Sequence, residues 1–227
     1  MRSRLTPLLA VLGLSVALGV VGAPAARADV PCVIDGVSPR SVVVGLTPIT
    51  RTFAVSTSGC TLGYWKAESD VFYVYKGSAE QTFGPRSNAE AGVHDVAVDA
   101  YDDYFMASSR DLPASFSLLR RTTWQDGSFN AAPEPAQRGS AMTVTGRLLV
   151  VDWSNGRYVP YVGRAVAVEF RTATGAWTRV KAVATDARGW VRTTVPAEAT
   201  GTWRLRYGGN TLAGPAVSTG DSVQVAG

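Results

Sequence analysis

The chain has 227 residues and a formal net charge of +4, and it contains two cysteines and one histidine. Two thiols and one imidazole cannot complete the four-ligand shell of a structural zinc site, which argues against zinc. The single histidine, His94, also leaves little material for a Ser-His-Asp enzyme, and no motif of another catalytic class accompanies it.

The N-terminal residues have the pattern of a secretory signal peptide, which we expect to span residues 1–28. Two arginines precede an apolar segment at 8–21, and residues 26–28 have the small-x-small pattern of a cleavage site. Cleavage then falls between Ala28 and Asp29. The rival interpretation is an uncleaved anchor, but the apolar segment is short for crossing a bilayer, and no later segment is longer. We therefore expect a secreted, extracellular protein without a membrane segment in its mature form.

Short strand candidates follow one another to the end of the chain, each rich in Val, Phe or Tyr and bounded by turn residues. In chain order they are 41–46, 51–56, 71–76, 93–101, 104–108, 114–121, 141–151, 164–171, 177–185, 190–195, 202–207 and 222–225. No segment after the leader keeps helical spacing. The pattern predicts an all-β protein built from antiparallel β-sandwiches.

Length and turn spacing predict two tandem domains. About 199 residues follow the expected cleavage site, which suits two domains of about 95 residues each. The Pro/Ala-rich segment at 131–136 is typical of a stiff linker. We therefore expect a first sandwich at 29–130 and a second at 137–227.

Alternation within the C-terminal strands predicts which side chains face the core. The apolar members, which we place in the core, are Val166, Val168, Phe170, Trp203, Leu205 and Tyr207. The polar members, which fall on the opposite side, include Glu169, Arg171, Arg204 and Arg206.

The segment at 177–195 predicts a β-hairpin that turns at Asp186-Ala-Arg-Gly189. With Thr185 opposite Trp190, period-two alternation puts Val180, Ala182, Val191 and Val195 on the core side. The exposed side then carries Trp177, Arg179, Lys181, Trp190 and Arg192. Two tryptophans among three cations suit stacking on sugar rings and pairing with acidic groups. The alternative is that the Arg and Lys stems simply cover the indole rings.

Several segments resemble bacterial Ig-like (prealbumin-like) β-sandwich modules, which are frequent in secreted actinobacterial proteins. They are Gly146-Arg-Leu, Val166-Ala-Val-Glu-Phe170, Trp177, Thr185-Asp-Ala-Arg-Gly189, Trp203-Arg-Leu-Arg-Tyr-Gly-Gly209 and Val223-Gln-Val225. The resemblance is clearer over about residues 137–225, and residues 29–127 resemble such a module by their strand count and expected disulfide, so that two Ig-like modules are implied. It implies an adhesive, spacer or accessory role and no particular activity.

The two cysteines, Cys32 and Cys60, are expected to pair with each other in an oxidising compartment. The bond would close a loop of about 29 residues and stabilise the fold by ~3–4 kcal/mol on the chain-entropy model. It would also leave no cysteine nucleophile.

An acidic cluster near residue 100 is the strongest candidate for other chemistry. Asp99, Asp102 and Asp103 could place oxygens around a calcium ion, and together with Asp95 they could supply a carboxylate-based enzyme. The third interpretation is a solvated strand face that runs into a polar turn. His94, near the start of that strand, is expected to be a packed or rim histidine.

Charge is distributed unevenly along the chain. Residues 29–131 contain 8 basic and 12 acidic side chains, whereas residues 132–227 contain 11 basic and 6 acidic ones. The basic half could bind an anionic cell-wall polymer, or the two halves could dock on each other. We expect a monomeric, non-enzymatic protein without a cofactor, which binds such a polymer or another secreted protein and no nucleic acid. The alternative is a carboxylate-based enzyme, a calcium-binding module or an enzyme inhibitor with an unrecognised loop.

Overall fold

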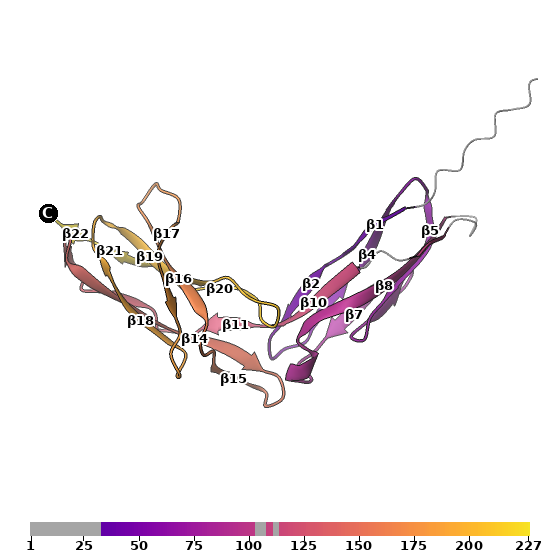
Figure 1. Ribbon diagram of the computed structural model, residues 1–227, viewed down its shortest axis with the longest axis horizontal. Helices are drawn as coiled ribbons and strands as arrows, with labels where there is room; N and C mark the ends of the chain where they lie inside the picture. Colours follow the sequence, from indigo (N-terminus) through magenta and orange to yellow (C-terminus); the bar gives the residue numbers. More distant parts are fainter. Residues whose placement is uncertain (1–32, 103–107, 111–113) are drawn as a thin grey trace, which may run out of the picture. The chain divides into compact units, whose positions relative to one another are not determined.

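The computed structural model describes residues 33–102, 108–110 and 114–227, and strands dominate these ranges (Figure 1). The expected leader and its cleavage site at Ala28 and Asp29 lie outside the described residues. The described helical element is a short 3-10 turn, Asn88–Glu90. The all-β expectation is confirmed.

The N-terminal lobe, residues 33–121, has two layers of strands. One layer has the order β2 (Ser41–Val44), β10 (Ala114–Arg120), β8 (Gly92–Asp102), β5 (Leu62–Glu68) and β6 (Tyr73–Tyr75), with β9 (Ser108–Arg110) also on β8. The other layer contains the pairs β1 (Val33–Ser38) with β4 (Ala54–Ser58) and β3 (Ile49–Thr52) with β7 (Glu80–Phe83). All these pairs are antiparallel except β2 with β10.

Aromatic side chains fill the centre of this lobe. Phe53, which separates β3 from β4, lies 4.5 Å from Phe72 and 5.7 Å from Phe116 between ring centroids. Trp65 and Ala67 of β5 are also buried, because alternate residues of this strand face the same layer interface. The sequence did not predict strand β5, although its apolar and polar residues alternate clearly.

The C-terminal lobe, residues 122–227, also has two layers. The long strand β14 (Ala141–Asp152) pairs with β11 (Thr122–Trp124), β12 (Asn130–Ala132), β15 (Arg157–Pro160) and β18 (Trp190–Pro196). The second layer contains β17 (Thr178–Ala184), β16 (Ala165–Arg171), β19 (Gly201–Tyr207), β20 (Ala216–Val217) and β21 (Asp221–Val223). A short parallel pair joins β13 (Ala136–Gln137) to β22 (Val225–Ala226).

The Pro/Ala segment at 131–136 is not a linker. Ala131 belongs to β12 and is 1% exposed, and Ala136 begins β13 and is 0% exposed. The small alanine side chains at these positions let the backbone approach the core closely. The Pro/Ala composition suggests a linker, but in this segment it serves packing. The chain passes from β10 to β11 through Arg121 alone.

Contacts near this passage tie the C-terminal lobe to the core of the N-terminal lobe. Val151 and Trp153 pack in the N-terminal core cluster. The indole Nε1 of Trp153 donates to the Val44 carbonyl at 3.2 Å, and the backbone N–H of Trp153 donates to Asn88 Oδ1 at 2.9 Å. Asn88 Nδ2 in turn donates to Asp152 Oδ1 at 2.7 Å. Each lobe has its own core, but a buried tryptophan of one completes the other.

Within the described ranges, no helix has the length and apolar character needed to span a membrane.

Candidate binding face

The outer side of the second layer of the C-terminal lobe is built by the pairing of β16 with β19. Val166 and Val168 face the core, where they lie opposite Tyr207 and Leu205. The intervening residues therefore point away from the core, because strand neighbours alternate between faces. They include Glu169, Arg171, Arg204 and Arg206.

Strand β17 adds a fourth arginine to this outer side. Its register with β16 shifts between Val168 and Glu169, so that Lys181 lies opposite Val168 and Arg179 opposite Glu169. The extra residue of this bulge is Val180. We call the set of Arg171, Arg179, Arg204 and Arg206 with Glu169 and Trp177 the arginine face.

One carboxylate lies at the centre of the arginine face. Glu169 is 7% exposed, and its Oε2 atom accepts from Nε of Arg204 at 2.7 Å, with Nη2 of Arg204 also at 2.7 Å. Its Oε1 atom lies 3.8 Å from Nη1 of Arg206. A carboxylate that is taken out of water needs a charged partner, and Arg204 is the partner of the buried Glu169. The two short contacts with Glu169 therefore hold the guanidinium of Arg204 in place.

Trp177, which precedes β17, covers part of the same face. The Cζ atom of Arg204 lies 3.8 Å from the centroid of the indole ring, and that of Arg171 lies 4.6 Å from it. Both distances are within the range of cation–π attraction. The indole therefore orders two guanidinium groups of the arginine face.

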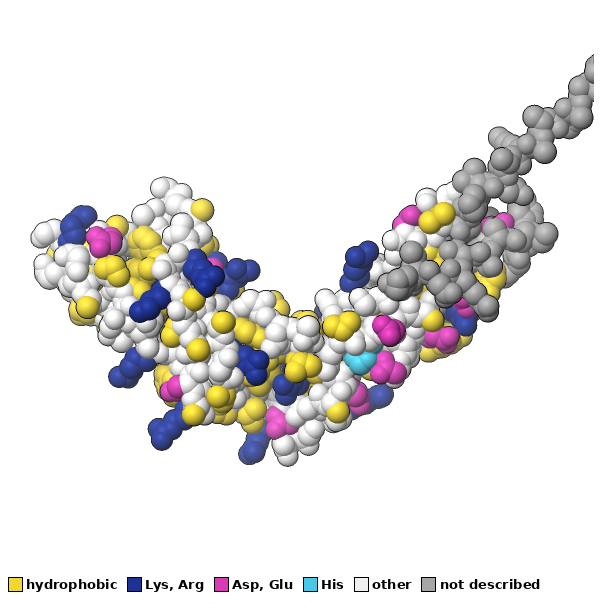
Figure 2. Space-filling model, in the orientation of Figure 1, with side chains coloured by type: hydrophobic (Ala, Val, Ile, Leu, Met, Phe, Trp, Pro, Cys, Tyr) yellow, Lys and Arg dark blue, Asp and Glu magenta, His cyan; other side chains and the backbone are white. Residues whose placement is uncertain are grey.

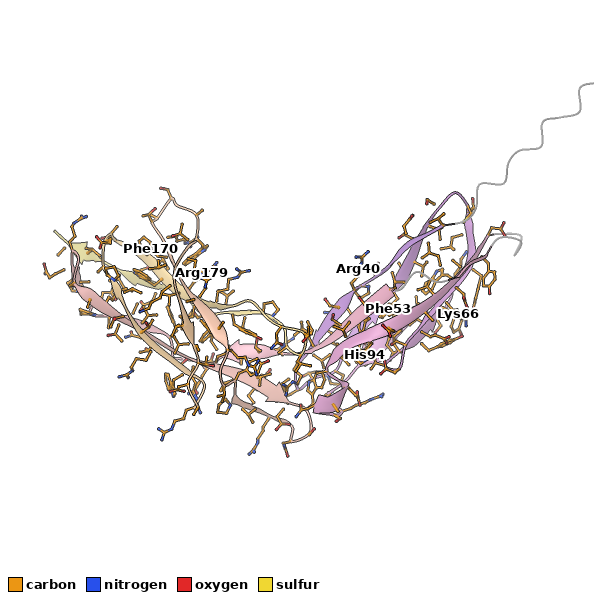
Figure 3. The ribbon with its side chains drawn as sticks, viewed as in Figure 1. Arg40, Phe53, Lys66, His94, Phe170 and Arg179 are labelled. Carbon is orange, nitrogen blue, oxygen red and sulfur yellow. The ribbon has the colours of Figure 1, made fainter. Side chains whose placement is uncertain are left out.

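The arginine face carries four cations and one anion. Arg171, Arg179 and Arg206 are exposed, whereas Arg204 is half-buried between Glu169 and Trp177. Side chains on one face of a strand repeat about every 7 Å, which gives a regular spacing of positive charge. Figure 2 shows Lys and Arg side chains over this lobe, and Figure 3 labels Arg179 on the same sheet as Phe170. Such a surface can bind an extended anion by several charge-assisted hydrogen bonds.

The hairpin expected at 177–195 is wrong in its pairing, although its turn exists. Gly189 donates its N–H to the Asp186 carbonyl at 3.0 Å and has a φ of +77°, which favours glycine. A Cβ atom there would lie 2.6 Å from the Leu148 carbonyl oxygen. After this turn, however, the chain crosses to the other sheet, because β17 pairs with β16 and β18 pairs with β14.

The five side chains expected together on that hairpin are consequently divided. Trp177 and Arg179 lie on the arginine face, as described above. Trp190 and Arg192 belong to the other sheet, where the Arg147 guanidinium lies 6.0 Å from the Trp190 ring. Lys181 points toward the layer interface, and its Nζ donates to the Thr194 carbonyl at 3.0 Å.

The core side of the expected hairpin was correct for β18 and wrong for β17. Val191 and Val195 are 0% and 3% exposed, but Val180 is 42% exposed and Ala182 is also exposed. Ala182 lies opposite Ala167, which points away from the core, and Val180 is the extra residue of the bulge. The sequence did not predict the rest of the arginine face as a site, although alternation in β16 and β19 placed these residues on one side. They are Glu169, Arg171, Arg204 and Arg206.

The acidic cluster is only partly within the described residues, because Asp103 lies outside them. Oδ2 of Asp99 lies 3.1 Å from Nζ of Lys66, and this hydrogen bond raises the pKa of Lys66. Asp102 begins no separate loop but ends β8. In the described ranges, no three His, Cys, Asp or Glu side chains form a group that could hold a metal ion. The calcium interpretation gains no support here.

His94 contacts two acceptors in the N-terminal lobe. Its Nδ1 lies 2.7 Å from Asp70 Oδ1, and its Nε2 lies 2.9 Å from the Glu90 carbonyl oxygen. The imidazole is 9% exposed, and it links β8 to the short 3-10 turn (Figure 3).

Of the two cysteines, Cys60 follows β4 and has a partner, whereas Cys32 lies outside the described residues. The register of β1 with β4 places Val33 opposite Ser58. This register is compatible with the expected pair, which stays a prediction.

Comparison with known proteins identifies no family for this chain. No protein-family model matches the chain, and no curated protein matches it in sequence. Among solved structures, three N-terminal domains of the Hoc capsid protein of bacteriophage RB49 match at 12% identity and a TM-score of 0.35, over 87% of this chain and 71% of that one. Fibronectin(III)-like modules of Clostridium thermocellum CbhA match at 13% identity and a TM-score of 0.39, over 86% of this chain and 92% of that one. The D00–D0 domain of intimin matches at 14% identity and a TM-score of 0.31, over 85% and 98%.

The strand order itself identifies the architecture. In the N-terminal lobe, the layer β2-β10-β8-β5-β6 faces the pairs β1–β4 and β3–β7. Strands β1 and β2 follow each other in the chain but belong to different layers. Two layers of mainly antiparallel strands joined by such crossings are the arrangement of immunoglobulin sandwiches. The fold is immunoglobulin-like.

Proposed function

We propose that this chain is an exported, non-enzymatic binding protein of two Ig-like modules, and that its arginine face binds an anionic cell-wall polymer. The observation that carries the proposal is the set of four arginines and one tryptophan around a single carboxylate on one sheet. Ig-like folds serve many functions, so the proposal depends on this surface and not on the fold.

The arrangement of Arg204 supports binding over a purely structural role. An isolated pair of Arg204 with Glu169 would satisfy the buried carboxylate by itself. Among the described residues, Arg171 and Arg179 form no ion pair, and Arg206 reaches only the carboxylate that Arg204 already binds, at 3.8 Å. The exposed guanidinium groups therefore outnumber the carboxylate on this face. Exposed like charges on one face repel one another, and a bound polyanion relieves this repulsion.

The shape of the face favours a polymer over a small anion. Its cations lie on the outer side of three neighbouring strands, β17, β16 and β19, and none of them lines a described cavity. An open sheet surface contacts a small ligand on one side only, whereas a chain of repeated anionic groups makes several contacts at once. The indole of Trp177 offers an apolar surface on which a sugar ring of such a polymer could stack.

We expect export of the protein from the leader-like pattern at 1–28. Export would put the arginine face next to the cell wall. Wall polymers with phosphate or carboxylate groups present the repeated negative charge that planar guanidinium groups recognise. The expectation of a monomer without a cofactor belongs to the same proposal.

The test is a pull-down of purified protein on isolated cell walls. The binding variant is Arg171→Gln/Arg179→Gln/Arg206→Gln, which removes three exposed cations and keeps the pair of Arg204 with Glu169. The matched control is Arg157→Gln/Arg188→Gln/Arg192→Gln, which removes three exposed cations of the same lobe from other elements.

We expect intact protein and the control variant to bind walls, and the binding variant to lose most binding. Walls from which the anionic polymer has been extracted should retain neither protein. Equal binding by both triple variants would contradict the assignment to the arginine face. Undiminished binding to extracted walls would point to a wall-associated protein as the partner.

A further inference from the structure

A short stretch of strand edge is left open in the N-terminal lobe where the first strand changes layers. Strand β1 pairs with β4 as far as Ser38, and β2 begins to pair with β10 at Ser41. Strand β2 pairs with β10 only from Ser117 onward. The described residues of β10 before Ser117 pair with β8 on one edge and with no described strand on the other.

The backbone of Ser115 faces this open edge. The N–H of Ser117 donates to the Arg40 carbonyl at 2.9 Å, which is on the side away from β8. Residues two apart in a strand direct their backbone groups the same way, so the N–H and C=O of Ser115 also point away from β8. Among the described residues, neither group has a backbone partner on that edge.

A cavity of about 270 Å³ adjoins this edge. Its apolar lining includes Phe72, Val96 and Phe116, which are 5%, 5% and 1% exposed. The volume is below the ~300–1,000 Å³ of typical small-molecule sites, and it suits one or two side chains.

A cation lies at the rim of the cavity. Arg40 is exposed, and it forms no ion pair with another described residue (Figure 3). Its Nη2 atom would lie 3.3 Å from a Cβ atom added to Gly36, so the guanidinium extends over β1 at a residue without a side chain. Gly36 and Arg40 both line the cavity, together with Asp35, whose Oδ1 accepts from Ser58 Oγ at 3.0 Å.

We propose that this edge binds the C-terminal end of an extended polypeptide whose last side chain is apolar. The segment runs parallel to β10, in line with β2, and exchanges two hydrogen bonds with the backbone of Ser115. Side chains of neighbouring strands share a face, so the final residue, opposite Phe116, enters the cavity. Its terminal carboxylate then reaches the guanidinium of Arg40.

The direction of the segment follows from charge and from chain direction. A parallel segment beside Ser115 ends where Pro39 and Arg40 cross between the layers, and this crossing leaves no room for further strand pairing. An antiparallel segment would place an ammonium terminus beside Arg40, which is unfavourable. Adding a strand to an open sheet edge with a side-chain pocket for specificity is a known mode of peptide recognition.

The experiment measures binding of the purified full chain to a random hexapeptide library with free C termini and to the same library with C-terminal amides. We expect selection of peptides that end in Leu, Ile, Val, Met or Phe, with at least about tenfold weaker binding after amidation, as for loss of a charge-assisted contact.

Two pairs of variants test the geometry. Ser115→Pro removes the N–H donor at an open edge, where proline is tolerated, whereas Ser115→Ala keeps it. Arg40→Gln removes the rim cation, whereas Arg51→Gln removes an exposed cation from β3. Ser115→Pro and Arg40→Gln should each weaken the selected peptides about fivefold to tenfold, and the two controls should not.

Near-ultraviolet circular dichroism checks that each variant keeps its packing, and hydrogen exchange adds a readout on the intact protein. Bound peptide should slow exchange at the Ser115 amide. The proposal is overturned if no peptide is selected, if amides bind equally well, or if Ser115→Pro binds like Ser115→Ala. It is likewise overturned if sedimentation shows that a second copy of the chain occupies the edge.

Discussion

The guanidinium of Arg204 lies over the indole ring of Trp177, with its Cζ atom 3.8 Å from the ring centroid, while its Nε donates to Glu169 at 2.7 Å. The cation is therefore held on its face by a ring and on its edge by a carboxylate. This double contact fixes one guanidinium of the arginine face and sets the geometry around which Arg171, Arg179 and Arg206 are arranged.

Glu169→Gln should destabilise the C-terminal lobe. The substitution leaves Arg204, whose side chain is 21% exposed, without its charged partner. We expect a loss of about 1–2 kcal/mol in the free energy of unfolding, since a half-buried charge loses its best hydrogen bond. Urea unfolding measures it, with Glu198→Gln on the exposed surface as the control. Equal stability of both variants would mean that solvent already satisfies Arg204.

Residues 137–227 alone should not fold cooperatively, contrary to the domain boundary expected from the sequence. This fragment lacks β11 and β12, and with them the buried side chains of Trp124 and Ala131. A fragment of residues 122–227 restores both strands. We expect a near-ultraviolet signal and a cooperative melt for the longer fragment only. A cooperative melt of the shorter one would show that β11 and β12 are dispensable.

Acid should weaken the protein partly through Asp152. Hydrogen bonds from Asn155 and then Asn88 hold the pKa of Asp152 below its ordinary value of 3.8. The stabilisation is therefore complete above the unfolded pKa, and it is lost as the pH falls through the lowered folded pKa. Asp152→Asn should flatten the fall in stability below about pH 4, because the titrating group is removed. Parallel stability profiles for the two proteins would contradict this role.

Cys32 and Cys60 are expected to form a disulfide in protein harvested without reductant. Mass analysis should then find intact protein lighter by two hydrogen atoms than its reduced form. Reduction should lower the free energy of unfolding by up to ~3–4 kcal/mol. Alkylation of both thiols before any reduction would refute the pair.

The sequence predicted best what depends on neighbouring residues. Alternation placed Trp203, Leu205 and Tyr207 in the core, and they are 3%, 0% and 3% exposed. The turn at 186–189 was also correct, because Asp186 and Gly189 specify it locally. Such features follow from the geometry of one strand or one turn.

What the sequence could not give was the choice of partner strand. Strands β17 and β18 flank a tight turn, yet β17 pairs with the strand before it, β16, and β18 pairs with β14, which lies further away in the chain. Packing of the two layers decides which strands pair, and the local sequence pattern does not predict it. The arginine face was therefore recognised only in part, through Trp177 and Arg179, while Arg204 and Arg206 entered it through the pairing of β16 with β19.

The most direct test of the arginine face is the salt dependence of binding to the purified anionic wall polymer. Intact protein and the variant Arg171→Gln/Arg179→Gln/Arg206→Gln would be titrated between about 50 and about 500 mM salt, over which screening of exposed charges increases strongly. Binding through these cations predicts a steep fall of affinity for intact protein, because bound salt ions are released from the polymer on association. The slope for the variant should be shallower by about three charges. Equal slopes for the two proteins, or an affinity of intact protein that does not change with salt, would contradict the account.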